Sequence, residues 1–347
     1  MSTQACRGII YAYRIAADGA ATSLAEQTLD AEGLPISGGE ISEEIAVSIH
    51  DALTSNDLAW VHLDSTEPSS RIWAETELNF LDSLTLDALF AEETRPRILE
   101  FEQGALLILR GVNLNANAEP EDMVSIRLWI DETRIVSVRR RRLRAVSDLR
   151  ERLHAGLGPK NAGEFLALLT SRLFERMEPA FSDLDERLDD AEECVMEEAD
   201  AKYRAQITAI RKQAIVFRRY IAPQRDVLTA LRVSDLSWLS ELHKRRLQES
   251  LDRVIRYIED IDTIRERAQI VKDELSNALT DKMNKNLYML SVIAAVFLPL
   301  GFLTGLLGIN VGGVPGVDNA SAFWIFSALL SVVVAVQIAL FKRWKWF

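Results

Sequence analysis

Two long uncharged segments near the C-terminus constrain the fold more than any other feature of this sequence. Residues 287–309 and residues 322–341 contain no Asp, Glu, His, Lys or Arg. At a rise of about 1.5 Å per residue, each segment is long enough to cross a hydrocarbon core of about 30 Å. Core helices of that length in soluble proteins normally have a polar stripe. We therefore predict two transmembrane helices, joined by a short loop over residues 310–321.

The residues around these two segments predict their orientation. Lys282 and Lys285 precede the first segment, and the tail 342–347 is basic and aromatic. The positive-inside rule places both termini in the cytoplasm and the short loop outside. The first ten residues lack the basic and apolar regions of a cleavable signal. We expect a multi-pass protein of the inner membrane with a cytoplasmic body.

The charge of the body narrows its function. The chain has 40 Lys and Arg against 52 Asp and Glu, a formal net charge of −12. Residues 282–347 hold five basic residues and one acidic residue, so residues 1–281 have a net charge of −16. Such a body attracts cations and repels nucleic acid, which we exclude as a partner. Because no nucleophile elbow, phosphate-binding glycine loop or kinase signature occurs, we predict neither an enzyme nor a cofactor.

Residues 1–158 have the mixed pattern of an α/β cytoplasmic domain. Short segments rich in Val, Ile, Leu, Trp or Tyr alternate with turn residues, which predicts strands. These segments are Gly8–Ile15, Leu58–Asp64, Ile98–Glu102, Ala105–Asn113, Met123–Ile130 and Arg134–Val138. We expect helices between them at Glu40–Thr54 and Pro68–Phe90.

Residues 159–286 predict a stalk of long helices. From Gln224 to Leu298 there is neither Gly nor Pro over 75 residues. Apolar residues fall mostly at steps of three and four, which predicts one apolar face. They are Leu247, Leu251, Val254, Ile258, Ile261, Ala268, Val271, Leu275 and Leu279. We expect one continuous helix of about 100 Å that enters the first span, and self-association to cover its stripe.

The first span ends in the motif Gly308-Ile309-Asn310 (GIN), followed by Gly312, Gly313, Pro315 and Gly316. Here the sequence resembles the CorA metal ion transporter family, whose signature at this place is Gly-Met-Asn. The Ile in place of Met is similar to the zinc-transporting ZntB branch. The position of the motif, Pro299, the distance from Asn284 to Asn310 and the long helix extend the resemblance over essentially the whole chain.

This resemblance implies a funnel-shaped homopentamer with one central pore. The first span of each subunit would line the pore, and the second would face lipid. Gly308, Ile309 and Asn310 would form the selectivity filter, with a ring of Asn310 amides contacting the hydrated metal ion through its water shell. The other pore-lining positions would be Asn284, Leu287, Leu290, Leu298, Gly301 and Gly305.

Physical arguments support these roles and also offer simpler ones. A neutral amide ring can hydrogen-bond to the water shell of a divalent ion, and Leu287 with Leu290 can form a constriction that dewets. Equally, Asn310 can serve as a helix C-cap. Small residues such as Gly301 can simply let helices pack closely in lipid.

The residues alone do not identify the transported ion. Ile309 cannot ligate a metal, and a backbone loop does not distinguish zinc from magnesium, cobalt or nickel. Neither span holds a titratable side chain, which favours a passive channel. The ZntB resemblance implies zinc coupled to protons, which would act through pore water, the hydration shell or carboxylates such as Asp273, Glu274 and Asp281. A membrane-anchored cation-sensing scaffold is the alternative of a different class.

Three other features could bind ligands. Ten acidic residues lie between Asp183 and Asp200, and Asp190 and Cys194 within them are candidate metal ligands; the alternatives are a solvated face and an inert thiol. The four histidines show no metal-binding spacing. The basic run 139–144 is interpreted as a solvated junction that pairs with the acidic body.

Overall fold

The computed structural model describes residues 8–27, 42–92, 94–309, 316 and 319–343, and it divides into two compact units. The first unit contains residues 1–197 and 202–272, and the second contains residues 198–201 and 273–347. The elements in chain order are β1 (Ile9–Ile15), β2 (Ala21–Glu26), α1 (Glu43–Thr54), β3 (Leu58–Asp64), α2 (Pro68–Glu77), α3 (Ser83–Phe90), β4 (Arg97–Glu100), β5 (Gly104–Gly111), β6 (Val124–Asp131), β7 (Arg134–Arg139), α4 (Arg144–His154), α5 (Ala162–Glu175), α6 (Glu178–Glu197), α7 (Tyr203–Val233), α8 (Glu241–Leu307) and α9 (Ala322–Arg343).

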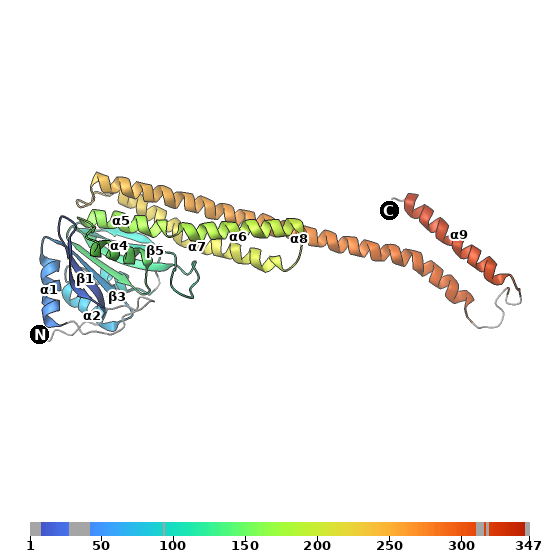
Figure 1. Cartoon of the computed structure of the whole chain (residues 1–347), viewed down its shortest axis with the longest axis horizontal. Helices are drawn as coiled ribbons and strands as arrows, with labels where there is room; N and C mark the ends of the chain where they lie inside the picture. The colour runs from blue at the N-terminus through green and yellow to red at the C-terminus, as the bar shows by residue number, and fades with distance from the viewer. Residues whose placement is uncertain (1–7, 28–41, 93, 310–315, 317–318, 344–347) are drawn as a thin grey trace. The chain divides into compact units, whose positions relative to one another are not determined.

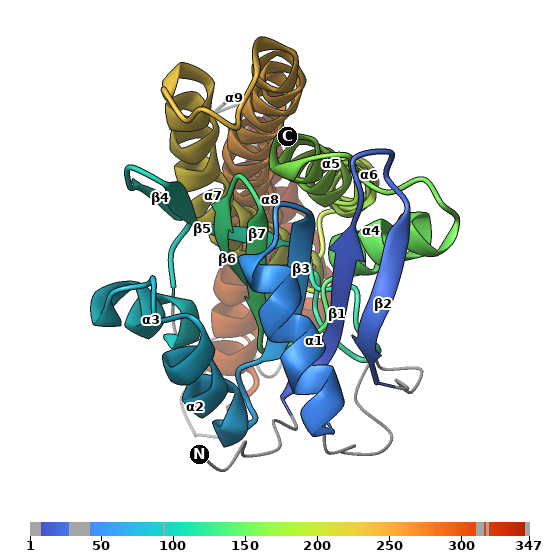
Figure 2. The same ribbon diagram turned by 90° about the vertical axis from the view of Figure 1, so that its left-hand side faces the viewer.

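A seven-stranded mixed sheet forms the base of the first unit. Its strand order is β2-β1-β3-β7-β6-β5-β4 (Figure 2). Among the described strands, only β3 and β7 pair in parallel, with Val61 opposite Val136, and the other neighbours are antiparallel. The six predicted strands are confirmed. The edge strand β2 was not predicted, because half of its residues are exposed and it lacks the apolar alternation of a half-buried strand.

Helices cover both faces of the sheet (Figure 2). α1, α2 and α3 bury one face, where Leu53 and Leu89 join Trp129 and Val138 in an apolar cluster. α4 and α5 lie on the other face, where the rings of Trp60 and Phe165 meet edge to face with centroids 4.9 Å apart. The predicted α/β domain is therefore a layered α/β structure with a buried sheet.

One predicted helix is in fact two. The segment Pro68–Phe90 breaks between α2 and α3, where Leu78 and Leu81 are buried. Asp82 caps α3 because its Oδ1 accepts a hydrogen bond from the backbone N of Thr85 at 2.6 Å. The predicted helical segment is confirmed as two helices, since an N-cap within the apolar run starts a new helix.

The long stalk helix is confirmed, although it does not fill the whole segment without Gly and Pro. α8 has 67 residues, about 100 Å at 1.5 Å per residue. Residues 234–240 separate it from α7: Ser234 is extended and its Oγ donates to the carbonyl of Leu231 at 2.9 Å. Leu236, Trp238 and Leu239 are buried. Apolar side chains therefore hold this turn without any Gly or Pro.

The apolar stripe of α8 is covered within the same chain from Leu247 to Leu275. The hydroxyl of Tyr257 donates to the carbonyl of Phe174 on α5, and Arg218 on α7 pairs with Asp262 at 2.6 Å. α6, α7 and this part of α8 run side by side (Figure 1). The expectation that other copies must cover this stripe was wrong, because helices α5 to α7 already do so.

The second unit contains the end of α8 and α9, the two predicted transmembrane helices. Both are long and apolar enough to cross a membrane, and no part of either apolar window is buried. This distinguishes them from core helices of a soluble protein. The side chain of Gln337 on α9 donates to the carbonyl of Ala295 on α8 at 3.4 Å. The apolar surface along both helices needs a bilayer or other copies to cover it.

Candidate functional site

The predicted pore-lining residues lie on one face of α8. At 3.6 residues per turn, their positions fall within about 120° around the helix axis. They are Asn284, Leu287, Leu290, Leu298, Gly301, Gly305 and Gly308. In the single chain this face is open: Leu287, Leu290 and Leu298 are 53%, 64% and 71% exposed. The helix thus brings the predicted set together as a stripe that its own chain leaves uncovered.

Two further residues complete this stripe and were not predicted. Ser291 and Ala294 fill the gap between Leu287 and Leu298. With them, the positions 284, 287, 291, 294, 298, 301, 305 and 308 alternate steps of three and four without a break. This is the repeat of helices that associate about a common axis. The same count along the sequence would have found both residues.

The glycines of the stripe are not required by packing within the chain. Apart from the adjacent residues and the backbone of α8 itself, no described atom lies within 4 Å of the position that a Cβ would take at Gly301 or Gly305. At Gly308 a Cβ would meet the carbonyl oxygen of Thr304 at 2.8 Å, so here the helix end itself favours glycine. Packing among the described residues of this chain therefore does not account for glycine at 301 and 305.

The stripe carries no charge, and its hydroxyl group is already bonded. The Oγ of Ser291 donates to the carbonyl of Leu287 at 2.8 Å, within the same helix. Thr304, next to the stripe, bonds in the same way to Leu300 at 2.9 Å. Apart from the amide of Asn284, such a surface offers a divalent ion few ligands that compete with its water shell.

The predicted filter begins where α8 ends. Leu307 is the last helical residue, and Gly308 and Ile309 follow it, with Ile309 50% exposed. Asn310 and residues 311–315 lie outside the described residues, so the Asn310 ring stays a prediction.

The acidic run on α6 is partly paired rather than simply solvated. Arg267 of α8 donates hydrogen bonds to Asp185, Asp189 and Glu192 at 3.1, 2.5 and 2.6 Å. These acceptors raise the pKa of the Arg267 guanidinium above its usual range. Part of the run is therefore neutralised by the long helix.

The candidate metal ligands of the body stay a prediction. Cys194 is half-buried and Asp190 is exposed. Within the described ranges no group of three or more His, Cys, Asp or Glu side chains is arranged to hold a metal ion.

The four histidines lie apart from one another. His62 is buried against Tyr11 and bonds through Nδ1 to the hydroxyl of Ser137 at 2.7 Å. Its burial, with nearby Arg139 and Arg150, holds the pKa of His62 well below its usual value. His50 pairs with Glu77, His154 contacts Tyr13, and the Nδ1 of His243 accepts from the backbone N of Ser240.

The basic run 139–144 begins at a buried arginine and continues into exposed ones. Arg139 is buried beside Asp64, with Nε and Oδ2 at 3.8 Å, while Arg140 pairs with Glu92 at 3.5 Å and Arg141 pairs with Asp122. The pairing with acidic residues is confirmed. The expectation of a wholly solvated run was wrong at Arg139, since it lies in the strand β7.

An α/β body, a long helix and two exposed apolar helices at the C-terminus define a membrane protein whose uncharged helix face is its candidate site. The sequence model of the family described as CorA-like Mg2+ transporter protein matches residues 55–343. The chain belongs to this family. The family is one of membrane transporters of divalent cations and not of enzymes.

Relatives and solved structures agree with this assignment. The divalent cation transporter CmaX of Pseudomonas aeruginosa is 39% identical over 89% of this chain and 93% of its own. The zinc transport protein ZntB of Pectobacterium atrosepticum is 35% identical over 98% of this chain and 96% of its own. The structure of full-length CmaX superposes with a TM-score of 0.79 at 35% identity, covering 99% of this chain and 100% of that one. The CorA magnesium transporter from Methanocaldococcus jannaschii shares the fold, with a TM-score of 0.76 at 16% identity and full coverage of both chains.

Proposed function

We propose that five copies of this chain form one central pore that carries divalent cations, zinc preferred, across the inner membrane. The observation that carries this proposal is the open stripe of α8, with its unbroken steps of three and four from Asn284 to Gly308. Two spans per chain cannot enclose a pore, so several copies must build it. The number five comes from the family resemblance.

The repeat supports a placement of α8 around the axis. Helices with steps of three and four present that face to their neighbours around a common axis. Packing among the described residues does not require glycine at Gly301 or Gly305. The lack of side chains there would allow either close approach of neighbouring helices or an open lumen. The spanning window of α9 has a mean hydropathy of 2.3, as suits a lipid-facing helix.

The chemistry of the pathway suits an ion that keeps its water. Small divalent ions shed water reluctantly, and a neutral surface does not force them to do so. Asn310 amides at the outer helix end would accept hydrogen bonds from the water shell. Leu287 and Leu290 would form the apolar constriction that closes by dewetting.

Zinc preference rests on the ZntB relatives, which align with nearly the whole chain. The name of CmaX is broader, and Ile309 cannot itself select a metal. Magnesium, cobalt and nickel are therefore the competing substrates in any test.

Proton coupling is the second part of the proposal. Because neither span holds a titratable side chain, protons would act through pore water, the hydration shell or carboxylates below the bilayer. Asp273, Glu274 and Asp281 are the carboxylates on the exposed part of α8 before the first span. Both termini would be cytoplasmic, with Lys282 and Lys285 at the inner end.

The test is flux into liposomes that contain the purified protein. Zinc and magnesium entry are measured separately, with and without an imposed pH gradient at constant voltage. Zinc entry that rises with the gradient supports the full proposal, and zinc entry indifferent to it removes proton coupling. Magnesium entry without zinc entry overturns the zinc preference, while no flux of either ion favours the cation-sensing scaffold.

The assembly is tested separately. Native mass spectrometry of the full chain in detergent should give a mass of five subunits. Any other stoichiometry contradicts the pentamer, whatever the flux.

A further inference from the structure

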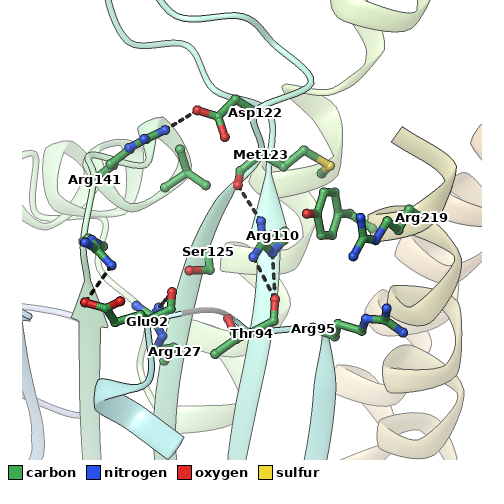
Figure 3. Close-up of a pocket in the computed structure, with 13 residues that line it drawn as sticks. Glu92, Thr94, Arg95, Arg110, Asp122, Met123, Ser125, Arg127, Arg141 and Arg219 are labelled. Carbon is green, nitrogen blue, oxygen red and sulfur yellow. Dashed lines mark hydrogen bonds and ion pairs between the residues drawn. The ribbon is translucent and has the colours of Figure 1, made fainter. Parts of the chain in front are cut away.

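A cavity of about 610 Å³ in the first unit is far more basic than the body around it (Figure 3). It lies where β5 and β6 approach α7, away from the transmembrane helices in sequence. Its described lining contains two carboxylates, Glu92 and Asp122, and six arginines. The arginines are Arg95, Arg110, Arg127, Arg140, Arg141 and Arg219. A surplus of four positive charges in one cavity stands against the net charge of −16 for residues 1–281.

Arg127 is the residue that points to a ligand. Its side chain is 1% exposed, and its Nη2 donates to the carbonyl of Glu92 at 3.2 Å. Its Nε and Nη1 are buried without a hydrogen-bond partner in the part of the chain that the structure describes. Leaving buried donors of a charged group unpaired costs more than leaving neutral ones.

The guanidinium of Arg127 nevertheless stays charged at neutral pH. Burial and the nearby charges of Arg110 and Arg140 lower its pKa to about 10, which is still well above 7. A buried cation with no acidic partner among the described residues is strongly destabilising unless something compensates it. An anion in the cavity would supply the missing negative charge.

Arg110 forms a fixed wall of the cavity. Its Nε and Nη2 donate to the carbonyl of Thr94 at 3.1 and 2.7 Å, and its Nη1 donates to the carbonyl of Met123 at 2.9 Å. Its guanidinium also stacks on the ring of Tyr220, 4.2 Å from the centroid. These contacts hold the charge in place before any ligand arrives, which lowers the entropy cost of binding.

The two carboxylates sit at the rim. Glu92 and Asp122 are 81% and 61% exposed at the side chain, and they pair with Arg140 and Arg141, which are also exposed. Exposed pairs of this kind contribute little and can rearrange. Arg95, exposed on the same rim, has no ion pair among the described residues. The rim pairs therefore leave the deep charge of Arg127 uncompensated.

We propose that this cavity binds a small anion that carries two or more phosphate groups. Guanidinium groups match phosphate oxygens in paired hydrogen bonds, and Arg110, Arg127 and Arg219 bring them from β5, β6 and α7 to one hollow (Figure 3). The volume exceeds that needed for a single phosphate and falls in the range of small-molecule sites, about 300–1,000 Å³. The four surplus positive charges match a multivalent anion.

The test is a calorimetric titration of the full-length protein in detergent with inorganic tripolyphosphate, in buffer free of divalent metal. Arg127→Met removes the buried charge at similar volume, and Arg95→Gln removes a rim charge. Arg204→Gln, an exposed arginine near the start of α7 and outside the cavity lining, is the matched control. Arg127→Met should weaken binding at least about tenfold, and Arg204→Gln should leave it within about twofold.

A stability measurement separates a ligand site from a structural role. If Arg127 serves to bind an anion, Arg127→Met should not lower the melting temperature of the ligand-free protein, because the substitution removes an unpaired buried charge. A marked loss of melting temperature together with unchanged tripolyphosphate binding contradicts the proposal. Should Arg127→Met fail to fold, the pair Arg95→Gln and Arg219→Gln, both exposed, carries the same binding test.

A parallel titration with ATP shows whether the cavity recognises a nucleotide or the phosphate chain alone. Tighter binding of ATP than of tripolyphosphate supports the proposal with a nucleotide as ligand, and equal binding supports it with the phosphate chain alone recognised. No binding of either probe at about 1 mM, or equal binding by the native protein and Arg127→Met, overturns it.

Discussion

Arg267 on α8 donates a hydrogen bond from Nη2 to Oδ1 of Asp189 on α6, at 2.5 Å. The same guanidinium also reaches Asp185 and Glu192, so one basic residue of the long helix gathers three carboxylates of the acidic run. The acidic run is therefore part of the packing between α6 and α8. Its charge has a structural use in addition to any attraction of cations.

Replacement of this arginine should loosen that packing. Arg267→Gln leaves three carboxylates facing one another, and we expect a loss of about 1 kcal/mol, or about 2–4 °C in melting temperature. High salt should shrink the difference, because the groups are partly exposed. Arg225→Gln, which breaks an exposed pair with Asp226, is the control and should change little. Equal melting of native protein and Arg267→Gln at low salt contradicts the role.

The buried His62 predicts a pH dependence of stability. The pKa of His62 in the folded protein lies well below its ordinary value. Below about pH 6.5, His62 is therefore protonated in the unfolded chain while it stays neutral in the folded protein. Stability is therefore fully present above this pH and falls by up to about 1.4 kcal/mol per pH unit below it. His243, whose pKa is also lowered by burial, acts in the same direction.

The measurement is thermal unfolding between pH 8 and pH 5. His62→Gln should melt lower than the native protein at pH 8 and approach it as the pH falls. A constant difference between His62→Gln and native protein across the range would exclude a depressed pKa as the cause.

Asn310 is the filter residue that the family resemblance implies. Asn310→Ala should abolish flux or make it unselective among zinc, magnesium and cobalt, while the oligomer remains intact by native mass spectrometry. Normal flux and selectivity in a correctly assembled variant would remove Asn310 from the filter role.

A substitution at Gly305 tests whether the stripe of α8 lines the transport pathway. Gly305→Val places a branched side chain where the single chain leaves empty space, so it should fold normally but narrow the pathway and cut flux at least about tenfold. Leu303→Val, on the opposite side of α8, is the matched control and should transport nearly normally. Equal flux in both variants would place Gly305 away from the pathway.

The sequence predicts the fold well where one physical signal dominates. Uncharged segments of 20 residues and more, and strands of buried Val, Ile and Leu, were recognised because burial or lipid requires them. The missed strand β2 is an edge, and its pairing with β1 depends on a neighbour rather than on its own pattern. The turn at residues 234–240 was missed because Leu236 and Trp238 hold it by tertiary packing.

The sequence predicts which residues share the face of α8, but it does not predict which part of that face the rest of the chain leaves uncovered. Periodicity gives the face of α8, and it would have included Ser291 and Ala294 if counted through. Periodicity alone could not show that α5 to α7 cover the stripe at Leu247 and not at Leu287, because coverage depends on the whole fold. Nor could it find the cavity around Arg127, which brings together residues more than 100 positions apart.

The central claim is that the stripe of α8 faces water along the axis of an assembly. Single cysteines are placed at each position from 284 to 308 in a chain whose Cys6 and Cys194 are replaced, and each is treated with a charged, water-soluble thiol reagent in proteoliposomes. We predict modification and loss of zinc flux at 284, 287, 290, 291, 294, 298, 301, 305 and 308, with protection at the other positions. Modification on the opposite face, or at all positions alike, would contradict the account.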